Sequence, residues 1–230
     1  MKEGVVYKIG MQEGQNSDFL KVEAHFLFKE EKPRTFRFPF WRPGRYEAGN
    51  FEKLIRGLQA FTPKGKPILP ETLDQKNFVW KESELCIRYE IWAGELNAGS
   101  CYADPRTMEG RLQINPIQAC IMSVPEPQIP CNLEVEVPEG WSFTTGLEAH
   151  RKENSVVLEA CSFDRLVDEP FLAAPNLLSI DIPGTPCPIS LIVVGNFPVN
   201  NERIAKDLGS CCQWQWNAFG GLDVESYRFL

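Results

Sequence analysis

The sequence predicts a mainly β protein, with an antiparallel, β-sandwich-like N-terminal domain followed by one amphipathic helix and a short strand. Three observations lead to this fold class. Alternating apolar and polar residues recur in short runs, and turns rich in Pro or Gly separate these runs at intervals of roughly 8–15 residues. Helical periodicity is almost absent from this part of the chain. It begins only near residue 200, where the pattern becomes that of an amphipathic helix.

The clearest strand covers residues 85–91, in which apolar side chains occupy every second position. This period of two indicates that one face of the strand packs in a core. The same alternation predicts strands at residues 20–28 and 131–137, and short strands are expected at residues 5–9 and 77–81. The strands at residues 5–9 and 20–28 are expected to form an antiparallel meander with the aromatic segment that follows them.

Residues 35–61 form the segment around which the rest of the chain is expected to be organised. Phe36, Phe38 and Phe40 occupy alternate positions, which predicts a strand with its aromatic face in the core. Residues 42–45 read Arg-Pro-Gly-Arg and predict a type II turn, because proline presets φ and glycine accepts a positive φ. Residues 54–61 then predict a second strand.

The middle of the chain is less regular. Residues 93–113 contain several glycines and no periodicity, which predicts a long irregular connection, and long connections are often functional. Residues 155–159 are expected to pair with residues 141–145. Residues 177–182 and 188–194 predict the last strands of the β domain.

A helix is expected from Asn200 or Asn201, either of which can cap its N-terminus, to Gly220. One stripe of this helix carries its large apolar residues at helical spacing. Those residues are Ile204, Leu208, Cys211, Cys212, Trp216 and Phe219. The sequence therefore predicts two domains: an all-β N-terminal domain over residues 1–195, and the incomplete start of a helical domain over residues 196–230.

The composition excludes some classes of partner. The net charge of −7 and the absence of a Lys/Arg cluster argue against binding to nucleic acid. No run of about 18 apolar residues is present, so no segment is expected to span a membrane. The first residues lead directly into a strand pattern rather than a signal peptide, which predicts a cytoplasmic location.

The eight cysteines include no C-x-x-C pair. Several lie within apolar strand patterns, where a free thiol behaves as a small hydrophobic residue. A disulfide framework belongs to smaller secreted chains, so the cysteines are expected to be reduced and buried. No local signature for a cysteine nucleophile beside a histidine base is present.

A catalytic zinc site needs three protein ligands, and on a helix it is typically written H-E-x-x-H. This chain has only two histidines, His25 and His150, and neither has a partner at helical or strand spacing. The sequence therefore predicts no metal site, no cofactor and no catalytic residue within these 230 residues.

Four segments, taken in order, resemble one known family. Residues 40–46 read Phe-Trp-Arg-Pro-Gly-Arg-Tyr, residues 92–96 read Trp-Ala-Gly-Glu-Leu, residues 163–170 read Phe-Asp-Arg-Leu-Val-Asp-Glu-Pro, and residues 219–222 read Phe-Gly-Gly-Leu. Together they resemble the front end of the M61 glycyl aminopeptidase family, zinc aminopeptidases with an N-terminal β domain ahead of a helical catalytic domain. The chain departs from the family pattern at Gly99-Ser100 and at Asn115-Pro116.

This resemblance implies that the β domain walls one side of an active-site cleft and helps to hold the free amine of a peptide substrate. Tyr102, Asp104 and Asn115 are the substrate-binding candidates, because carboxylate, amide and hydroxyl oxygens accept hydrogen bonds from an ammonium group. The zinc motif would lie after residue 230, so zinc is expected in the full-length protein and the chain alone is expected to be inactive. The implied partners are the catalytic domain of the same polypeptide and the peptide substrate.

Two other interpretations remain open from the residues. One is a stand-alone β-sandwich module that binds a protein or carbohydrate, or that serves in adhesion. The other is a relative of the peptidases that has lost its zinc motif and kept a scaffolding role.

Overall fold

A computed structural model describes residues 3–11, 18–41, 48–72, 76–97, 99–104, 110–125, 128–195, 198, 200–221 and 224–230. The turn predicted at residues 42–45, and most of a loop expected between the first two strands, lie outside the described residues. Strands account for 47% of the chain and helices for 16%, which confirms the predicted mainly β class. Among the described helices, none combines the length and hydrophobicity needed to cross a membrane.

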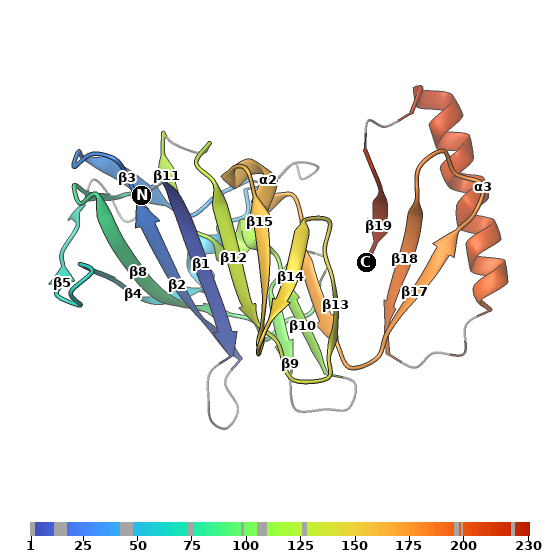
Figure 1. Ribbon diagram of the computed structural model, residues 1–230, viewed down its shortest axis with the longest axis horizontal. Coiled ribbons are helices and arrows are strands. Elements are labelled where there is room, and N and C mark those ends of the chain that lie inside the picture. The colour runs from blue at the N-terminus through green and yellow to red at the C-terminus, as the bar shows by residue number, and fades with distance from the viewer. Residues whose placement is uncertain are drawn as a thin grey trace.

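The largest sheet has eight strands and forms the body seen on the left of Figure 1. Its strands, in spatial order, are β14 (Glu148–Lys152), β15 (Ser155–Ala160), β12 (Cys131–Glu136), β1 (Gly4–Met11), β2 (Phe19–Leu27), β8 (Glu84–Trp92), β4 (Ile55–Phe61) and β5 (Pro67–Ile68). All neighbours pair antiparallel except β1 and β12, which are parallel.

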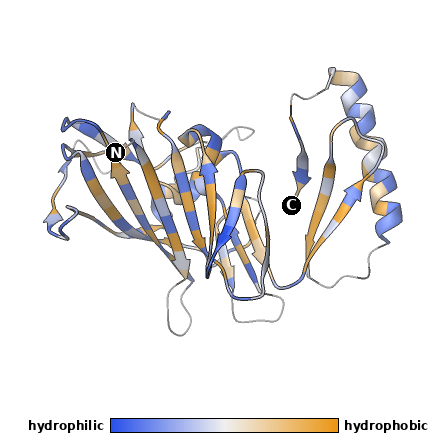
Figure 2. Cartoon of the chain, in the orientation of Figure 1, coloured by the Kyte–Doolittle hydropathy of each residue, from blue (hydrophilic) through white to orange (hydrophobic). Residues whose placement is uncertain are grey.

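The strands of this sheet follow the period of two that the sequence predicts. On β2, every second residue from Leu20 to Phe26 is at most 1% exposed, whereas the residues that alternate with them lie on the outer, polar face. Figure 2 shows the same alternation as bands of orange and blue along β1, β2 and β8. Burying one face of every strand accounts for the core, because removing apolar surface from water is the main favourable term in folding.

Two four-stranded sheets pack with the large sheet around this core. One has the order β13 (Ser142–Thr144), β16 (Phe171–Ala174), β10 (Arg111–Ile114) and β9 (Tyr102–Asp104). The other has the order β11 (Met122–Val124), β3 (Arg34–Arg37), β7 (Phe78–Trp80) and β6 (Glu71–Thr72). The short helices α1 (Pro116–Ala119) and α2 (Phe163–Val167) and the 3₁₀ turn Phe51–Leu54 connect strands.

Two buried tyrosines tie the large sheet to the chain that links α1 to β11. The Tyr7 hydroxyl donates to the carbonyl of Ile121 at 2.7 Å. The Tyr89 hydroxyl donates to the carbonyl of Ala119 at 2.6 Å and accepts from the backbone N–H of Ile121 at 3.1 Å. These bonds satisfy backbone groups in a segment without regular pairing, where a buried unpaired group would cost about 1–3 kcal/mol.

The segment expected to organise the fold differs from its prediction at one end. The strand β3 stops at Arg37 and pairs with β11 and β7, so it does not extend the meander of β1 and β2. Phe36 and Phe38 are buried as expected, but Phe40 is 54% exposed. The pairing of β3 with β11 covers residues 35–37. Beyond Arg37 the described residues are not paired in a sheet, so the alternation no longer decides which side chains are buried.

Two other expectations in the middle of the chain are wrong. β15 pairs with β12 and β14, whereas β13, which was expected to pair with it, pairs with β16 in another sheet. The hairpin of β14 and β15 closes within two residues, with Glu153 at φ 52°, and this local turn decides the pairing. The connection expected over residues 93–113 also contains β9 and part of β10.

The last part of the chain forms a separate small sheet covered by a helix on one side (Figure 1). The strands β17 (Leu177–Ile182), β18 (Ile189–Val194) and β19 (Tyr227–Phe229) make the sheet, with β19 parallel to β18. The helix α3 (Asn201–Phe219) contacts β17.

The ends of α3 are those that the sequence predicts. The side chain of Asn200 accepts from the backbone N–H of Arg203 at 3.0 Å, and Gly220 ends the helix at φ 80°. The apolar stripe is only partly confirmed, because Ile204 and Trp216 are half-buried while Phe219 is 82% exposed.

The division of the chain at residues 195 and 196 stays a prediction. Among the strands that the structure describes, hydrogen bonding joins β17 and β18 to β19 and to no strand of the other sheets. A small second core, made by Leu172, Ala174, Ile192 and Val194, lies where this sheet meets the end of β16. Strand pairing among the described residues therefore favours a boundary just before β17.

Five of the eight cysteines are buried, as the sequence predicts for reduced thiols in apolar strands. The buried ones are Cys86, Cys101, Cys120, Cys131 and Cys187. Cys161 and Cys211 are exposed instead, because Cys161 precedes the short helix α2 and Cys211 lies on the outer side of α3.

Candidate functional site

A cleft of about 1010 Å³ lies between the β9–β10–β16 sheet and the C-terminal segment of residues 224–230. The strand β10 contributes Arg111 and Gln113 to its wall, and the region of α2 contributes Arg165 and Glu169. The segment that ends the chain forms the opposite side. A cleft of this size is at the upper end of the range for small-molecule and peptide sites.

The wall on β10 is held by the alternation of that strand. Leu112 and Ile114 are 1% and 0% exposed and anchor the strand in the core, which turns Arg111 and Gln113 outward to the cleft. The side-chain amide of Gln113 donates to the carbonyls of Asn97 at 2.9 Å and Ser100 at 3.0 Å. These bonds fix the loop before β9 against the rim of the cleft.

The wall near α2 comes from residues 163–170. The hydroxyl of Ser162 caps α2 by accepting from the backbone N–H of Arg165 at 3.2 Å. The guanidinium of Arg165 pairs with the carboxylate of Glu169, one helical turn later, at 2.5 Å. Glu169 lies so close to Gly146 that a Cβ at that glycine would overlap its carboxylate. A larger residue at this position would have to displace that flexible carboxylate from its present place.

Tyr102 and Asp104, two of the three predicted substrate-binding residues, lie on β9 with their side chains on one face. The register pairs Tyr102 with Gln113 and Asp104 with Arg111, and residues directly opposite in an antiparallel pair share a face. Ala103, between them, is buried. Tyr102 and Asp104 are half-buried and lie beside the residues that line the cleft, on the face that leads to it.

Asn115, the third predicted residue, lies apart from this pair. It precedes α1, is 7% exposed, and makes no side-chain capping bond. Its backbone N–H donates to the sulfur of Cys101 at 3.4 Å, and its carbonyl accepts from the Cys101 thiol at 3.6 Å. The structure thus brings Tyr102 and Asp104 together and places Asn115 in the interior behind them.

Sequence reasoning missed Arg111 and Gln113 as wall residues. Their strand follows a glycine-rich stretch, and its four residues are too few for a clear period of two. Residues 163–170 stand out in the sequence only through the family resemblance. Nothing in their pattern points to the wall of a cleft, because Phe163 and Leu166 pack in the core while Arg165 and Glu169 reach the cleft.

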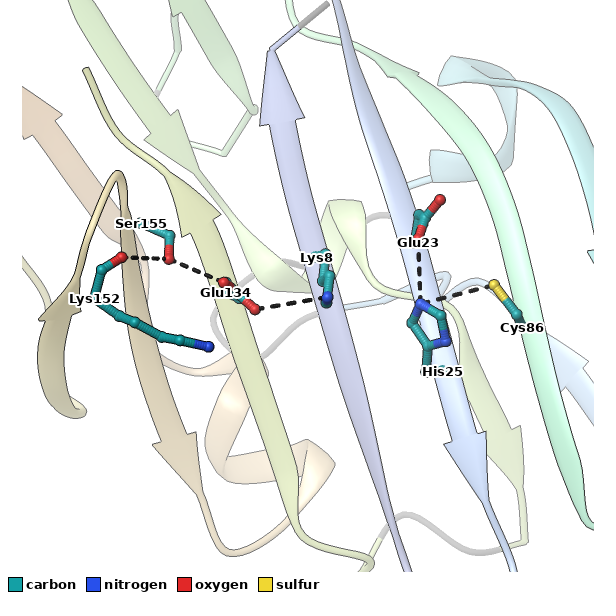
Figure 3. Close-up of polar contacts among 7 residues, drawn as sticks. All are labelled: Lys8, Glu23, His25, Cys86, Glu134, Lys152 and Ser155. Atoms are coloured by element: carbon teal, nitrogen blue, oxygen red, sulfur yellow. Dashed lines mark hydrogen bonds and ion pairs between the residues drawn. The ribbon is translucent and has the colours of Figure 1, made fainter. Parts of the chain in front are cut away.

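The expectation that His25 has no partner at strand spacing is wrong. Glu23 lies two residues earlier on the outer face of β2, and Cys86 lies directly opposite His25 on β8. Figure 3 shows the three side chains turned toward one another. Among the described residues, these three form the one group of at least three His, Cys, Asp or Glu side chains whose ligand atoms lie close enough together to hold a metal ion. His150, the other histidine, is exposed on the edge strand β14.

Comparison with known proteins connects this fold to a peptidase family. The family model for the peptidase M61 N-terminal domain matches residues 7–175. An aminopeptidase N family protein from Idiomarina loihiensis has a similar structure, with a TM-score of 0.82 and 23% identity, over 98% of this chain and 38% of that chain. An M1 zinc metallopeptidase from Deinococcus radiodurans matches 99% of this chain and 55% of that one at 11% identity, with a TM-score of only 0.45.

No curated protein matches the chain. The chain spans well under half the length of the Idiomarina protein, and at 23% identity that likeness shows the fold alone. The match to the family model covers most of the chain and includes three of its sheets, from β1 to β16. On that match, the chain belongs to the peptidase M61 N-terminal domain family.

Proposed function

We propose that this chain is the N-terminal domain of a zinc aminopeptidase, in which it walls the active-site cleft and helps to position the peptide N-terminus. The observation that carries the proposal is the cleft between the β9–β10–β16 sheet and residues 224–230, in a chain of the M61 family. The zinc and its ligands would belong to the catalytic domain of the same polypeptide. Glycine or alanine at the substrate N-terminus is the preference that the family resemblance implies.

Asp104 is the residue proposed to hold the substrate amine. Its carboxylate would accept a charge-assisted hydrogen bond from the ammonium group, and such bonds contribute more than neutral ones. Tyr102 lies on the same face and would add its hydroxyl. Asn115 would act indirectly. It is 7% exposed, and its backbone N–H holds Cys101, the residue before β9, in place.

The outer side of α3 supports a partner domain in the same polypeptide. Trp214 is 69% exposed and Phe219 is 82% exposed, although both are large apolar residues. Exposed apolar side chains of this size are suited to contact with another domain. We infer that α3 is the element against which the helical catalytic domain would pack.

We expect Asp104→Asn, in the full-length protein, to raise KM for a peptide with a free N-terminus about 10- to 100-fold. The substitution keeps the shape of the side chain but removes the charge, and a hydrogen bond to a charged group contributes about 1.5–3 kcal/mol. Steady-state kinetics on an alanyl or glycyl peptide measure the effect. Glu139→Gln is the matched control, because it removes the same charge from an exposed turn after β12 that neither lines the cleft nor lies on α3.

Unchanged KM in Asp104→Asn, with activity intact, would contradict the assigned role of β9. It would leave the family assignment in place, because that rests on the sequence match. The expected order of effect is Asp104 first, Tyr102→Phe second and Asn115→Ala last, since Asn115 is buried away from the cleft.

The alternative of a stand-alone binding or adhesion module stays a prediction. Phe40 and Trp41, which are 54% and 50% exposed, are the observation that favours it, because exposed aromatic residues often contact a ligand. Binding of a protein or carbohydrate that is lost in Phe40→Ala but not in Asp104→Asn would support the module. The cytoplasmic location expected from the sequence also stays a prediction.

A further inference from the structure

We propose that Glu23, His25 and Cys86 form a binding site for a divalent transition metal of the zinc or cobalt type. The site lies on the outer face of the large sheet, and none of its three residues is among those that line the cleft. The proposed metal site does not depend on the proposed peptidase function, and this chain supplies all three of its protein ligands.

Strand geometry brings the three side chains together. Glu23 and His25 are two residues apart on β2, so both point to the outer face. The register of β2 and β8 places Cys86 directly opposite His25. The His25 Nε2 lies 3.2 Å from the Glu23 Oε2 and 3.8 Å from the Cys86 Sγ, and all three ligand atoms lie within 4.8 Å of one another (Figure 3).

Two of the three separations, those from the His25 Nε2, are close to those of a tetrahedral zinc site. With zinc bonds of about 2.3 Å to sulfur and 2.0–2.2 Å to nitrogen and oxygen, tetrahedral angles place sulfur about 3.6 Å from nitrogen and nitrogen about 3.4 Å from oxygen. The observed distances of 3.8 Å and 3.2 Å differ from these by about 0.2 Å. Small rotamer changes would therefore let the three atoms meet one ion, with water as the fourth ligand.

The geometry does not fit a cysteine–histidine–carboxylate catalytic relay. Such a relay needs the thiol and the carboxylate on opposite ring nitrogens, so that one nitrogen accepts a proton while the other donates. Here the same atom, Nε2, faces both groups. Convergence on one point is what a metal ion requires.

The surroundings hold the ligands and leave access for an ion. Arg88 binds the other carboxylate oxygen of Glu23 at 2.8 Å, which fixes the direction of Oε2, and its guanidinium stacks over Phe61. Cys86 is 7% exposed, whereas the side chains of His25 and Glu23 are 43% and 38% exposed. A hollow of about 310 Å³ borders His25 and Cys86 and offers room for water ligands.

The test is a titration of the metal-free 230-residue chain with Co²⁺, followed by absorption spectroscopy. The wild-type chain is expected to bind one Co²⁺ with a thiolate-to-cobalt charge-transfer band, because the sulfur of Cys86 is a ligand. Cys86→Ser should lose the band. His25→Ala and Glu23→Gln should weaken Co²⁺ binding at least about tenfold. Mutation of a residue that only hydrogen-bonds to a metal ligand already lowers metal affinity about 10- to 100-fold.

Two variants serve as matched controls. Cys211→Ser removes an exposed thiol on α3, and His150→Ala removes the other histidine, so both should keep the wild-type band and affinity. Should Cys86→Ser fail to fold, alkylation of the wild-type chain with and without Zn²⁺ replaces it, and Zn²⁺ should slow modification of Cys86 but not of Cys211. Absence of a saturable band in the wild type, or a band that persists without Cys86, would overturn the proposal.

Discussion

Phe36→Ala is expected to lower the free energy of unfolding by about 3–5 kcal/mol, the cost of removing a large aromatic side chain from a packed core. Phe36 is 1% exposed. Its ring lies edge-on to Phe26 with centroids 5.0 Å apart, and to Trp80 with centroids 5.3 Å apart. Since Phe26 is on β2 and Trp80 on β7, the ring joins two sheets, and the protein cannot easily collapse around the cavity.

Phe40→Ala is the matched control for this prediction. It removes the same side chain four residues later in the same aromatic segment, but from a position that is 54% exposed, so its expected cost is within about 0.5 kcal/mol. Urea unfolding of both variants and the wild type measures the difference. Equal losses in the two variants would mean that the alternation of Phe36 to Phe40 continues into the core after all.

The second large effect is expected at alkaline pH, where the protein should lose stability steeply above about pH 9. Burial raises the pKa of Cys101 and of Cys131 to about 12, and it raises the pKa of Cys120 well above its usual value of 9.0. Burial also raises the pKa values of Tyr7 and Tyr89 well above 10.0. All five groups therefore stay protonated in the folded protein at pH values at which the same groups in the unfolded chain have lost their protons.

The direction follows from proton binding. Below about pH 9 the folded and unfolded chains both hold these protons, so the groups contribute no pH dependence. Above it, the unfolded chain binds fewer protons, and stability falls by about 1.4 kcal/mol per pH unit for each buried thiol until the pH reaches its folded pKa. The tyrosines add to the slope above about pH 10.

Urea unfolding under reducing conditions, from neutral pH to about pH 10.5, measures this slope. Cys131→Ala should make the fall in stability less steep by the contribution of one buried thiol, about 1.4 kcal/mol per pH unit. Cys211→Ala should leave the slope unchanged because Cys211 is exposed. Stability that stays level through pH 10.5 would show that these thiols reach solvent in the folded protein.

Sequence reasoning located the elements that local signals decide. The ends of α3 follow from a capping asparagine and a terminal glycine, which act within one turn of the helix. The strands β2 and β8 follow from alternation over nine residues each, long enough for a clear period. The three-residue strand β9 carries no such signal, so it was predicted as part of a loop.

Pairing between distant strands could not be predicted in the same way. The parallel pair of β1 and β12 depends on where the intervening chain returns, and nothing local to Val5 or Cys131 encodes it. The same limit applies to the sites. Tyr102 and Asp104 were found through the family resemblance, but their neighbours Gln113 and Arg111 required the strand register.

The metal-ligating group illustrates the limit most clearly. Glu23 and His25 are two residues apart, which strand alternation alone could have placed on one face. Cys86 could not have been added to them, because only the pairing of β2 with β8 brings it opposite His25.

The most direct test of the central claim is an aminopeptidase assay with a glycyl or alanyl peptide, run on the purified 230-residue chain beside the full-length protein. The central claim is that residues 1–230 form a wall of the cleft and that the catalytic zinc is held elsewhere. We expect zinc-dependent release of the N-terminal residue by the full-length protein, and none by the 230-residue chain even with zinc in excess. Release by the 230-residue chain that a chelator abolishes would contradict this account.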